Sequence, residues 1–142
     1  MAISVCWEGN MKFVGKDAAG NAVTMDASQV YGGRGEGVRP MDLLLMAVAG
    51  CSGIELTHIL NKMRLNFEAL SIEIQGDRAD DHPKIFTNMQ LIFKFTGADL
   101  MPEKVLHALK LTDETYCSVS NTVGKVAGIS YIVEINGQRC DI

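Results

Sequence analysis

The fold of this chain is decided by residues 40–52, which read PMDLLLMAVAGCS. Pro40 suits the first position of a helix, and Asp42 in the first turn complements the positive end of the helix dipole. The residues that follow are apolar on every side and include several small ones, whose size lets another backbone approach closely. We therefore expect a helix from Pro40 to about Arg64, with its first half buried against another helix.

The residues before this helix alternate in hydrophobicity over short distances. Residues 2–8 place Ile3, Val5 and Trp7 on one face, which is the period of a half-buried strand. Gly-Asn pairs at 9–10 and 20–21 are typical turn residues. The pattern predicts an antiparallel meander of strands at 2–8, 11–15 and 22–26, followed by a mobile glycine-rich loop at 32–37.

The residues after the helix predict two long strands, two helices and a final strand. Residues 70–75 and 85–95 alternate as strands, and helical spacing begins at about Pro102 and ends near Cys117. Ser118 or Ser120 can cap a short helix that ends at Lys125, and residues 129–135 alternate again. Because strands and helices do not alternate regularly, we expect an α+β fold with an antiparallel sheet packed on helices.

Composition limits the partners and the location. A chain of 142 residues fits one domain, residues 1–142. The net charge of −4 offers no basic surface for nucleic acid. The N-terminus lacks the pattern of a secretory signal, so we expect a cytoplasmic protein. The apolar run at 43–54 is shorter than the roughly 20 residues of a membrane span, so we expect no membrane partner.

The four cysteines indicate neither a metal site nor a disulfide scaffold. Cys6, Cys51, Cys117 and Cys140 form no Cys-x-x-Cys pair, and the three histidines lie at no ligand spacing. Without an export signal, the thiols are expected to stay reduced. What remains is the reactivity of single cysteines.

Cys51 is the first candidate nucleophile, and a cysteine reacts as its thiolate. Its apolar surroundings raise the pKa of a thiol unless a cation reaches it from another segment. His58 lies about 10 Å further along the helix, too far for a Cys-His pair. The carboxylate of Glu55, one turn away, would raise the pKa further. Taken alone, a cysteine in such a helix is more often a small packing residue.

Cys117 is the second candidate. It precedes the expected short helix, so its sulfur can feel the positive end of the helix dipole. Packing beside Tyr116 and Val119 explains its position equally well. The residues alone leave both explanations open, and their spacing cannot pair the two sulfurs.

Two cysteine-containing motifs resemble the OsmC/Ohr family, the osmotically inducible and organic hydroperoxide resistance proteins. One is the stretch 40–52, which contains Cys51, and the other is the sequence YCSV at 116–119, which contains Cys117. Trp7-Glu8-Gly9, Met25-Asp26 and the order of the elements also resemble this family. The resemblance therefore covers essentially the whole chain.

This resemblance implies a fold and a reaction. The fold is an intertwined homodimer in which antiparallel sheets wrap long central helices, with two active sites at the interface. In the reaction, Cys51 attacks the O–O bond of an organic hydroperoxide and becomes a sulfenic acid, and Cys117 then condenses with it to a disulfide. A dithiol reductant restores the pair, so this peroxidase needs no metal or organic cofactor.

The sequence departs from the family pattern beside the attacking cysteine. There the family places an arginine that stabilises the thiolate and a glutamate that holds the arginine. The glutamate normally follows the helix-starting proline, but here Met41 does, and Asp42 lies about 100° further round the helix as an imperfect substitute. For the cation we favour Arg34, with Arg39 and Lys16 as alternatives.

The missing glutamate motivates a second hypothesis. A non-catalytic member of the same fold would bind a small apolar molecule in the groove of the dimer, with both cysteines serving as packing residues. A hydrolase or a Cys-His acyl transferase ranks third, because no histidine is placed beside either cysteine.

Overall fold

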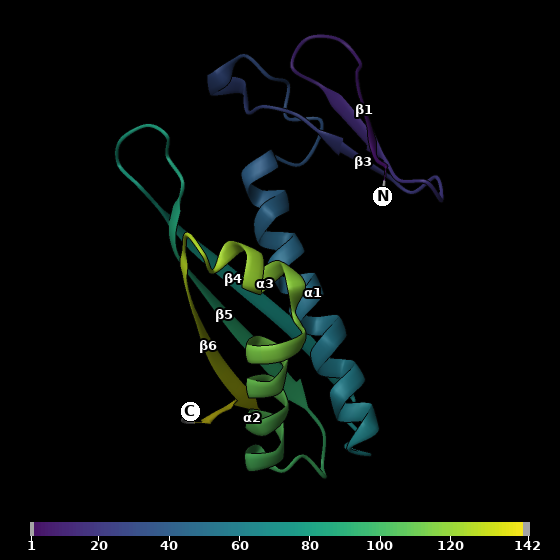
Figure 1. The fold of residues 1–142 in the computed structure, drawn as a ribbon, viewed down its shortest axis with the longest axis vertical. Coiled ribbons are helices and arrows are strands. Elements are labelled where there is room, and N and C mark those ends of the chain that lie inside the picture. The colour runs from purple at the N-terminus through teal and green to yellow at the C-terminus, as the bar shows by residue number, and fades with distance from the viewer. Residues whose placement is uncertain (1, 141–142) are drawn as a thin grey trace. The chain divides into compact units, whose positions relative to one another are not determined.

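The computed structural model describes residues 2–140 and forms two compact units, of which one ends at Leu44 and the other begins at Leu45 (Figure 1). The boundary falls inside helix α1, Pro40–Lys62. This helix was expected from Pro40 to about Arg64, so the prediction is confirmed within two residues. The assignment of residues 1–142 to a single domain stays a prediction.

The N-terminal unit contains the expected meander. Strands β1 (Ser4–Trp7), β2 (Phe13–Lys16) and β3 (Ala22–Met25) pair antiparallel in that order. The first turn depends on Gly9 and Asn10, which both have positive φ, 96° and 51°. A short 3-10 helix, η1 (Gln29–Tyr31), follows the third strand.

The loop that the glycines predict as mobile is held by a buried carboxylate. Asp26 is 3% exposed. Its oxygens accept the backbone N–H groups of Ala27 at 2.8 Å, Arg34 at 3.1 Å and Glu36 at 3.0 Å. These hydrogen bonds lower the pKa of Asp26, with the N–H of Glu36 as the largest cause. The loop is therefore tied to β3 through one side chain.

The C-terminal unit is built on a four-stranded sheet. Its strands are β4 (Ala69–Arg78), β5 (Phe86–Thr96), β6 (Gly128–Ile135) and β7 (Gln138–Cys140), in that order. The β4–β5 pair is antiparallel as expected, and β6 pairs antiparallel with β7, a strand that the sequence analysis did not predict, but β5 and β6 are parallel. A parallel pair needs a long crossover connection, and the helices between β5 and β6 provide it.

Two helices and a π-helical turn form that crossover. Helix α2 (Pro102–Leu111) continues into the π-helical turn η2 (Thr112–Tyr116), and helix α3 (Ser118–Val123) follows. The expected capping of α3 by Ser118 or Ser120 is wrong. The cap is Cys117, whose extended backbone places its sulfur to accept the N–H of Ser120.

The core of this unit lies between one face of the sheet and the helices (Figure 1). Alternate residues of β5 are buried there, together with residues of α1 and α2: Met89, Leu91, Phe93, Phe95, Val48, Leu56, Leu60 and Val105. A Cβ atom at Gly53 would lie 2.7 Å from Cδ1 of Ile72. Strand β4 therefore packs closely against the small residues of α1, where the sequence analysis predicted another helix.

Helix α1 is buried on one side only. Leu56 and Leu60 are fully buried, but Met46 is 54% and Ile54 71% exposed. By length and hydropathy, α1 also meets the criterion for a membrane span, as core helices of soluble proteins do. The expectation of a buried helix therefore holds for the side that faces the sheet.

Candidate functional site

A group of sulfur and hydroxyl side chains lies in the C-terminal unit, where α1 meets the start of α3. We call it the dithiol cluster, and its members are Cys51, Ser52, Cys117, Ser120 and Tyr131. Helix α1 supplies the first two and strand β6 supplies Tyr131. Residues far apart in the sequence thereby come together around two thiols.

The π-helical turn places Cys117 in this cluster. The N–H of Cys117 donates to the carbonyl of Thr112 at 2.8 Å, which closes the turn. The side-chain amide of Asn121 donates to the carbonyls of Asp113 at 2.8 Å and of Cys117 at 3.0 Å. The backbone on both sides of Cys117 is therefore fixed by hydrogen bonds.

Cys117 is fully buried and surrounded by polar groups. Its Sγ lies 3.1 Å from Oγ of Ser120 and 3.4 Å from Oγ of Ser52. The backbone N–H of Ser120 donates to the same sulfur at 3.4 Å. The two serine hydroxyls are also 3.1 Å apart, so the sulfur and both hydroxyls form one hydrogen-bonded group.

These contacts decide the ionisation of Cys117. Burial is the largest single influence and raises the pKa of the thiol. Hydrogen bonds from the Ser120 hydroxyl, the Ser52 hydroxyl, the Ser120 N–H and the Cys51 thiol together outweigh burial, and they lower the pKa of Cys117 below its ordinary value. A buried thiol without such donors would stay protonated and inert.

Cys51 has the opposite character. It is half-buried, and burial raises the pKa of its thiol. The backbone N–H of Val119 works in the other direction, whereas Cys117 and the carboxylate of Glu55 raise the pKa further. The effects of burial and of Glu55 have the direction that the sequence predicts.

The structure brings the two candidate cysteines close enough for each to influence the pKa of the other. Both thiols are free, and a side-chain hydrogen bond from Cys51 to Cys117 contributes to the pKa of each. Cys6 is exposed on β1 and Cys140 lies on β7. The assignment of Cys51 as the attacking and Cys117 as the resolving residue stays a prediction.

A tyrosine and an aspartate extend the cluster, and the sequence analysis missed both. The Tyr131 hydroxyl donates to the Asp113 carboxylate, and Ser120 lies near enough to lower the pKa of Tyr131 slightly against the stronger opposing effects. Burial raises the pKa of Tyr131, and Asp113 raises it further. Tyr131 lies on the inward face of an alternating strand, where a buried hydroxyl needs a partner, so the pattern contained a signal.

The candidate cations lie in the N-terminal unit. The backbone N–H of Arg34 donates to Asp26, and Lys16 ends β2. Arg39 donates Nε and Nη2 to the two oxygens of Asp42, at 2.7 and 3.1 Å. Asp42 therefore holds an arginine, but that arginine is Arg39, and the place of Arg34 beside Cys51 stays a prediction.

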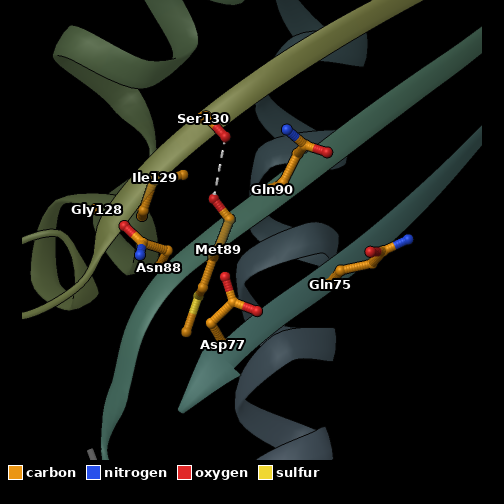
Figure 2. Close-up of a pocket in the computed structure, with 8 residues that line it drawn as sticks. All are labelled: Gln75, Asp77, Asn88, Met89, Gln90, Gly128, Ile129 and Ser130. Carbon is orange, nitrogen blue, oxygen red and sulfur yellow. Dashed lines mark hydrogen bonds between the residues drawn. The ribbon is translucent and has the colours of Figure 1, made fainter. Parts of the chain in front are cut away.

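A polar pocket lies on the other face of the C-terminal sheet. The pocket has a volume of about 370 Å³, and Figure 2 shows residues that line it, among them Gln75, Asp77, Asn88, Gln90 and Ser130. Ser130 donates to the carbonyl of Met89 at 3.4 Å. The lining contains no cysteine, and within residues 2–140 no group of three His, Cys, Asp or Glu could hold a metal ion.

Comparison with known proteins connects this geometry to a family. The family model described as OsmC-like protein matches residues 33–131. Protein YhfA of Escherichia coli strain K12 is 33% identical over 135 residues, which is 95% of this chain and 98% of that protein. The family match includes Arg34, Cys51 and Cys117.

Solved structures show the same fold. A hypothetical protein from Aquifex aeolicus VF5 is 28% identical with a TM-score of 0.79, over 95% of this chain and 96% of the other. An organic hydroperoxide resistance protein OsmC from Legionella pneumophila is 18% identical with a TM-score of 0.72, over 94% and 95% of the two chains. With the family model, the YhfA match and these structures in agreement, the chain belongs to the OsmC-like protein family.

Proposed function

We propose that this protein is a thiol peroxidase that reduces organic hydroperoxides with Cys51 and Cys117. The observation that carries the proposal is the proximity of two reduced thiols, of which one is half-buried and the other fully buried, and each of which influences the pKa of the other. A thiol that can be reached from outside is suited to meet the substrate. A buried thiol near it is suited to form a disulfide.

In the first step, the thiolate of Cys51 attacks one oxygen of the hydroperoxide. The O–O bond breaks, an S–O bond forms, and the leaving alkoxide takes up a proton and departs as an alcohol. Cys51 becomes a sulfenic acid, so sulfur is oxidised and the peroxide is reduced.

In the second step, the thiolate of Cys117 attacks the oxidised sulfur of Cys51. An S–S bond forms, the S–O bond breaks, and the hydroxide that leaves takes up a proton to become water. An external dithiol then reduces the disulfide by thiol–disulfide exchange and is itself oxidised. We place this cycle in the cytoplasm, where dithiol reductants are maintained.

The first step needs a cation beside Cys51, because burial, Cys117 and Glu55 raise the pKa of its thiol. We assign this role to Arg34, which belongs to the segment matched by the family model. A guanidinium within about 4–6 Å lowers the pKa of a thiol by stabilising the thiolate. Arg39 is already paired with Asp42, which makes it the second choice.

Exposed apolar surface supports a homodimer. Large apolar side chains are exposed in both units, among them Ile3 at 66%, Trp7 at 65% and Ile54 at 71%. Apolar patches of this kind mark interaction surfaces in proteins that remain in water. We propose a second copy of this chain as the partner that covers them.

An open apolar groove between α1 and the start of β4 is compatible with an organic substrate. Its volume is about 710 Å³, and its lining includes Gly50, Gly53, Ile54, Phe67 and Leu70. Gly50 precedes Cys51 in the chain, and Cys51 itself is not part of the lining. An apolar lining of this type favours an alkyl or aryl hydroperoxide over hydrogen peroxide, because burial of hydrocarbon contributes about 25 cal/mol per Å².

The test is consumption of cumene hydroperoxide in the presence of a dithiol such as dithiothreitol. The Cys51→Ser variant is expected to lose the activity completely, because serine cannot form a sulfenic acid. Cys6→Ser is the matched control and is expected to keep it, because Cys6 lies exposed on β1. Equal rates for wild type and Cys51→Ser would remove the proposal.

The same groove favours a second candidate, a non-catalytic protein that binds a small apolar molecule. In that case the groove would hold a ligand and the thiols would only pack. The pKa of Cys51 in the assembled protein separates the candidates. A value below the ordinary value of about 8.5 supports the peroxidase, and a raised value supports the binding protein.

A further inference from the structure

We infer that Ser52 and Ser120 stabilise Cys117 in its reduced form and thereby make the disulfide between Cys51 and Cys117 easy for a dithiol to reduce. The inference rests on the proposed function, because it concerns the step that restores the two thiols. It assigns to two buried serines the role of setting the reduction potential of the site.

The sulfur of Cys117 and two hydroxyl oxygens form a closed triangle inside the C-terminal unit. Oγ of Ser52 lies 3.4 Å from Sγ of Cys117 and 3.1 Å from Oγ of Ser120. The third side, from Sγ of Cys117 to Oγ of Ser120, is 3.1 Å. Cys117 is 0%, Ser52 1% and Ser120 2% exposed, so the three groups depend on one another for hydrogen bonds.

Packing alone does not explain two serines at these positions. Both lie in helices, where alanine is the stronger helix former and a buried hydroxyl needs a hydrogen-bond partner. Thr112, which is also buried, satisfies its hydroxyl locally by donating to the carbonyl of Ala108 at 3.0 Å. The hydroxyls of Ser52 and Ser120 meet a sulfur and each other instead.

The triangle stabilises the thiol and its thiolate more than the disulfide. A thiol can donate and accept a hydrogen bond, and a thiolate accepts strongly because it is charged. A disulfide sulfur has no hydrogen to donate and carries no charge. Oxidation of Cys117 therefore weakens its bonds with both serines, which keep the bond to each other.

The ionisation of Cys117 agrees with this assignment. Burial raises the pKa of the thiol, but the hydroxyls of Ser120 and Ser52 are the two largest opposing influences, and the pKa is lowered in balance. Stabilisation of the reduced form makes the corresponding disulfide a stronger oxidant, because the oxidised form does not share in it.

The restoring step then gains driving force from the two serines. A thiolate of the external dithiol attacks the disulfide, the S–S bond between Cys51 and Cys117 breaks, and an S–S bond forms within the reductant. Two electrons and two protons pass from the reductant to the two protein sulfurs. The reduced sulfur of Cys117 regains its full hydrogen bonds with Ser52 and Ser120.

The experiment measures the dithiol–disulfide equilibrium of the full-length protein. The parent protein carries Cys6→Ser and Cys140→Ser, so that Cys51 and Cys117 are its only cysteines. It is equilibrated at about pH 7 in redox buffers of glutathione and of dithiothreitol, each with its oxidised form. Samples are quenched in acid and alkylated with N-ethylmaleimide in denaturant, and intact-mass spectrometry counts the free thiols.

Ser52→Ala and Ser120→Ala are introduced singly into this parent. Loss of either hydroxyl should make the disulfide about threefold to tenfold harder to reduce, which moves the potential by about 15 to 30 mV to more negative values. Ser118→Ala is the control, because its exposed side chain lies outside the triangle, and it should titrate with the parent.

Thermal unfolding of the reduced and oxidised proteins identifies the variants that fold, and a shift in either serine variant supports the inference. A purely structural role would lower the melting temperature of both forms equally and leave the potential unchanged. If both serine variants titrate with the parent, or become easier to reduce, the inference falls and the peroxidase stands. A parent that forms no disulfide in any buffer removes the resolving step of the proposed function and the inference together.

Discussion

Cys51 and Cys117 lie close enough to influence each other's pKa, yet their surroundings differ in almost every respect. Cys51 is half-buried on helix α1, receives one backbone N–H from Val119 and lies near the carboxylate of Glu55. Cys117 is fully buried, shares hydrogen bonds with two serine hydroxyls and accepts one from a backbone N–H. Cys51 is therefore the sulfur that solvent and substrate can reach, and Cys117 is the sulfur whose negative charge the protein stabilises.

This division suits the two steps of the proposed reaction differently. Hydrogen bonds within the C-terminal unit lower the pKa of the buried thiol, which favours its thiolate and the closing of the disulfide. The thiol that meets the substrate has a raised pKa, so the proposed reaction needs a cation to activate it, the role that we assign to Arg34. The comparison thus predicts separate consequences when each environment is changed.

The largest effect is expected from Cys117→Ser, which removes the resolving thiol. Cys51 should still react once, but its sulfenic acid would persist and gain further oxygens with excess peroxide. Catalytic turnover should cease, and intact-mass spectrometry should show two and three added oxygens. Cys140→Ser is the control, since Cys140 lies on β7. A Cys117→Ser protein that turns over like wild type would show that Cys117 is not the resolving residue.

The second-largest effect is expected from Arg34→Gln, which tests whether Arg34 supplies the positive charge that the Cys51 thiolate needs. If the guanidinium stabilises the thiolate of Cys51, its loss should slow oxygen addition by about tenfold or more, because a nearby cation shifts a thiol pKa by 1–3 units. Stopped-flow kinetics with limiting cumene hydroperoxide measures this rate. Arg39→Gln and Lys16→Gln are matched controls. A loss confined to one of those two variants would move the role to that residue.

Much of the fold follows from residue patterns. Alternation predicts strands β1 to β6, and the proline at 40 with the apolar run behind it predicts α1 within two residues. The parallel pairing of β5 with β6 was missed, because alternation fixes which side chains share a face but not which strand lies beside which. Pairing depends on the crossover helices, whose packing is a tertiary property.

Less of the site could be predicted. Cysteine is an unusual helix cap, so Cys117 was not recognised as the residue that starts α3. Tyr131 and Asp113 are separated by the whole of α3, and no local spacing indicates that they bond. The proximity of Cys51 and Cys117 likewise depends on how α1 packs against α3. The pairing of these cysteines was therefore expected only from the family resemblance.

The smallest effect is expected from Glu55→Gln, which should change the pKa of Cys51 and leave Cys117 unaffected. Burial is the larger cause of the raised pKa of Cys51, and the Glu55 carboxylate adds to it. Neutralising Glu55 should therefore lower the pKa of Cys51 by a few tenths of a unit, about the effect of one partly screened charge. Because the pKa falls, the thiolate fraction at neutral pH rises, and alkylation of Cys51 by iodoacetamide should become up to about twofold faster. Peptide mass spectrometry follows Cys51 and Cys117 separately. Glu103→Gln, on α2, is the control. Slower alkylation of Cys51 in Glu55→Gln would mean that Glu55 holds a cation beside the thiol, and the carboxylate would then belong to its activation.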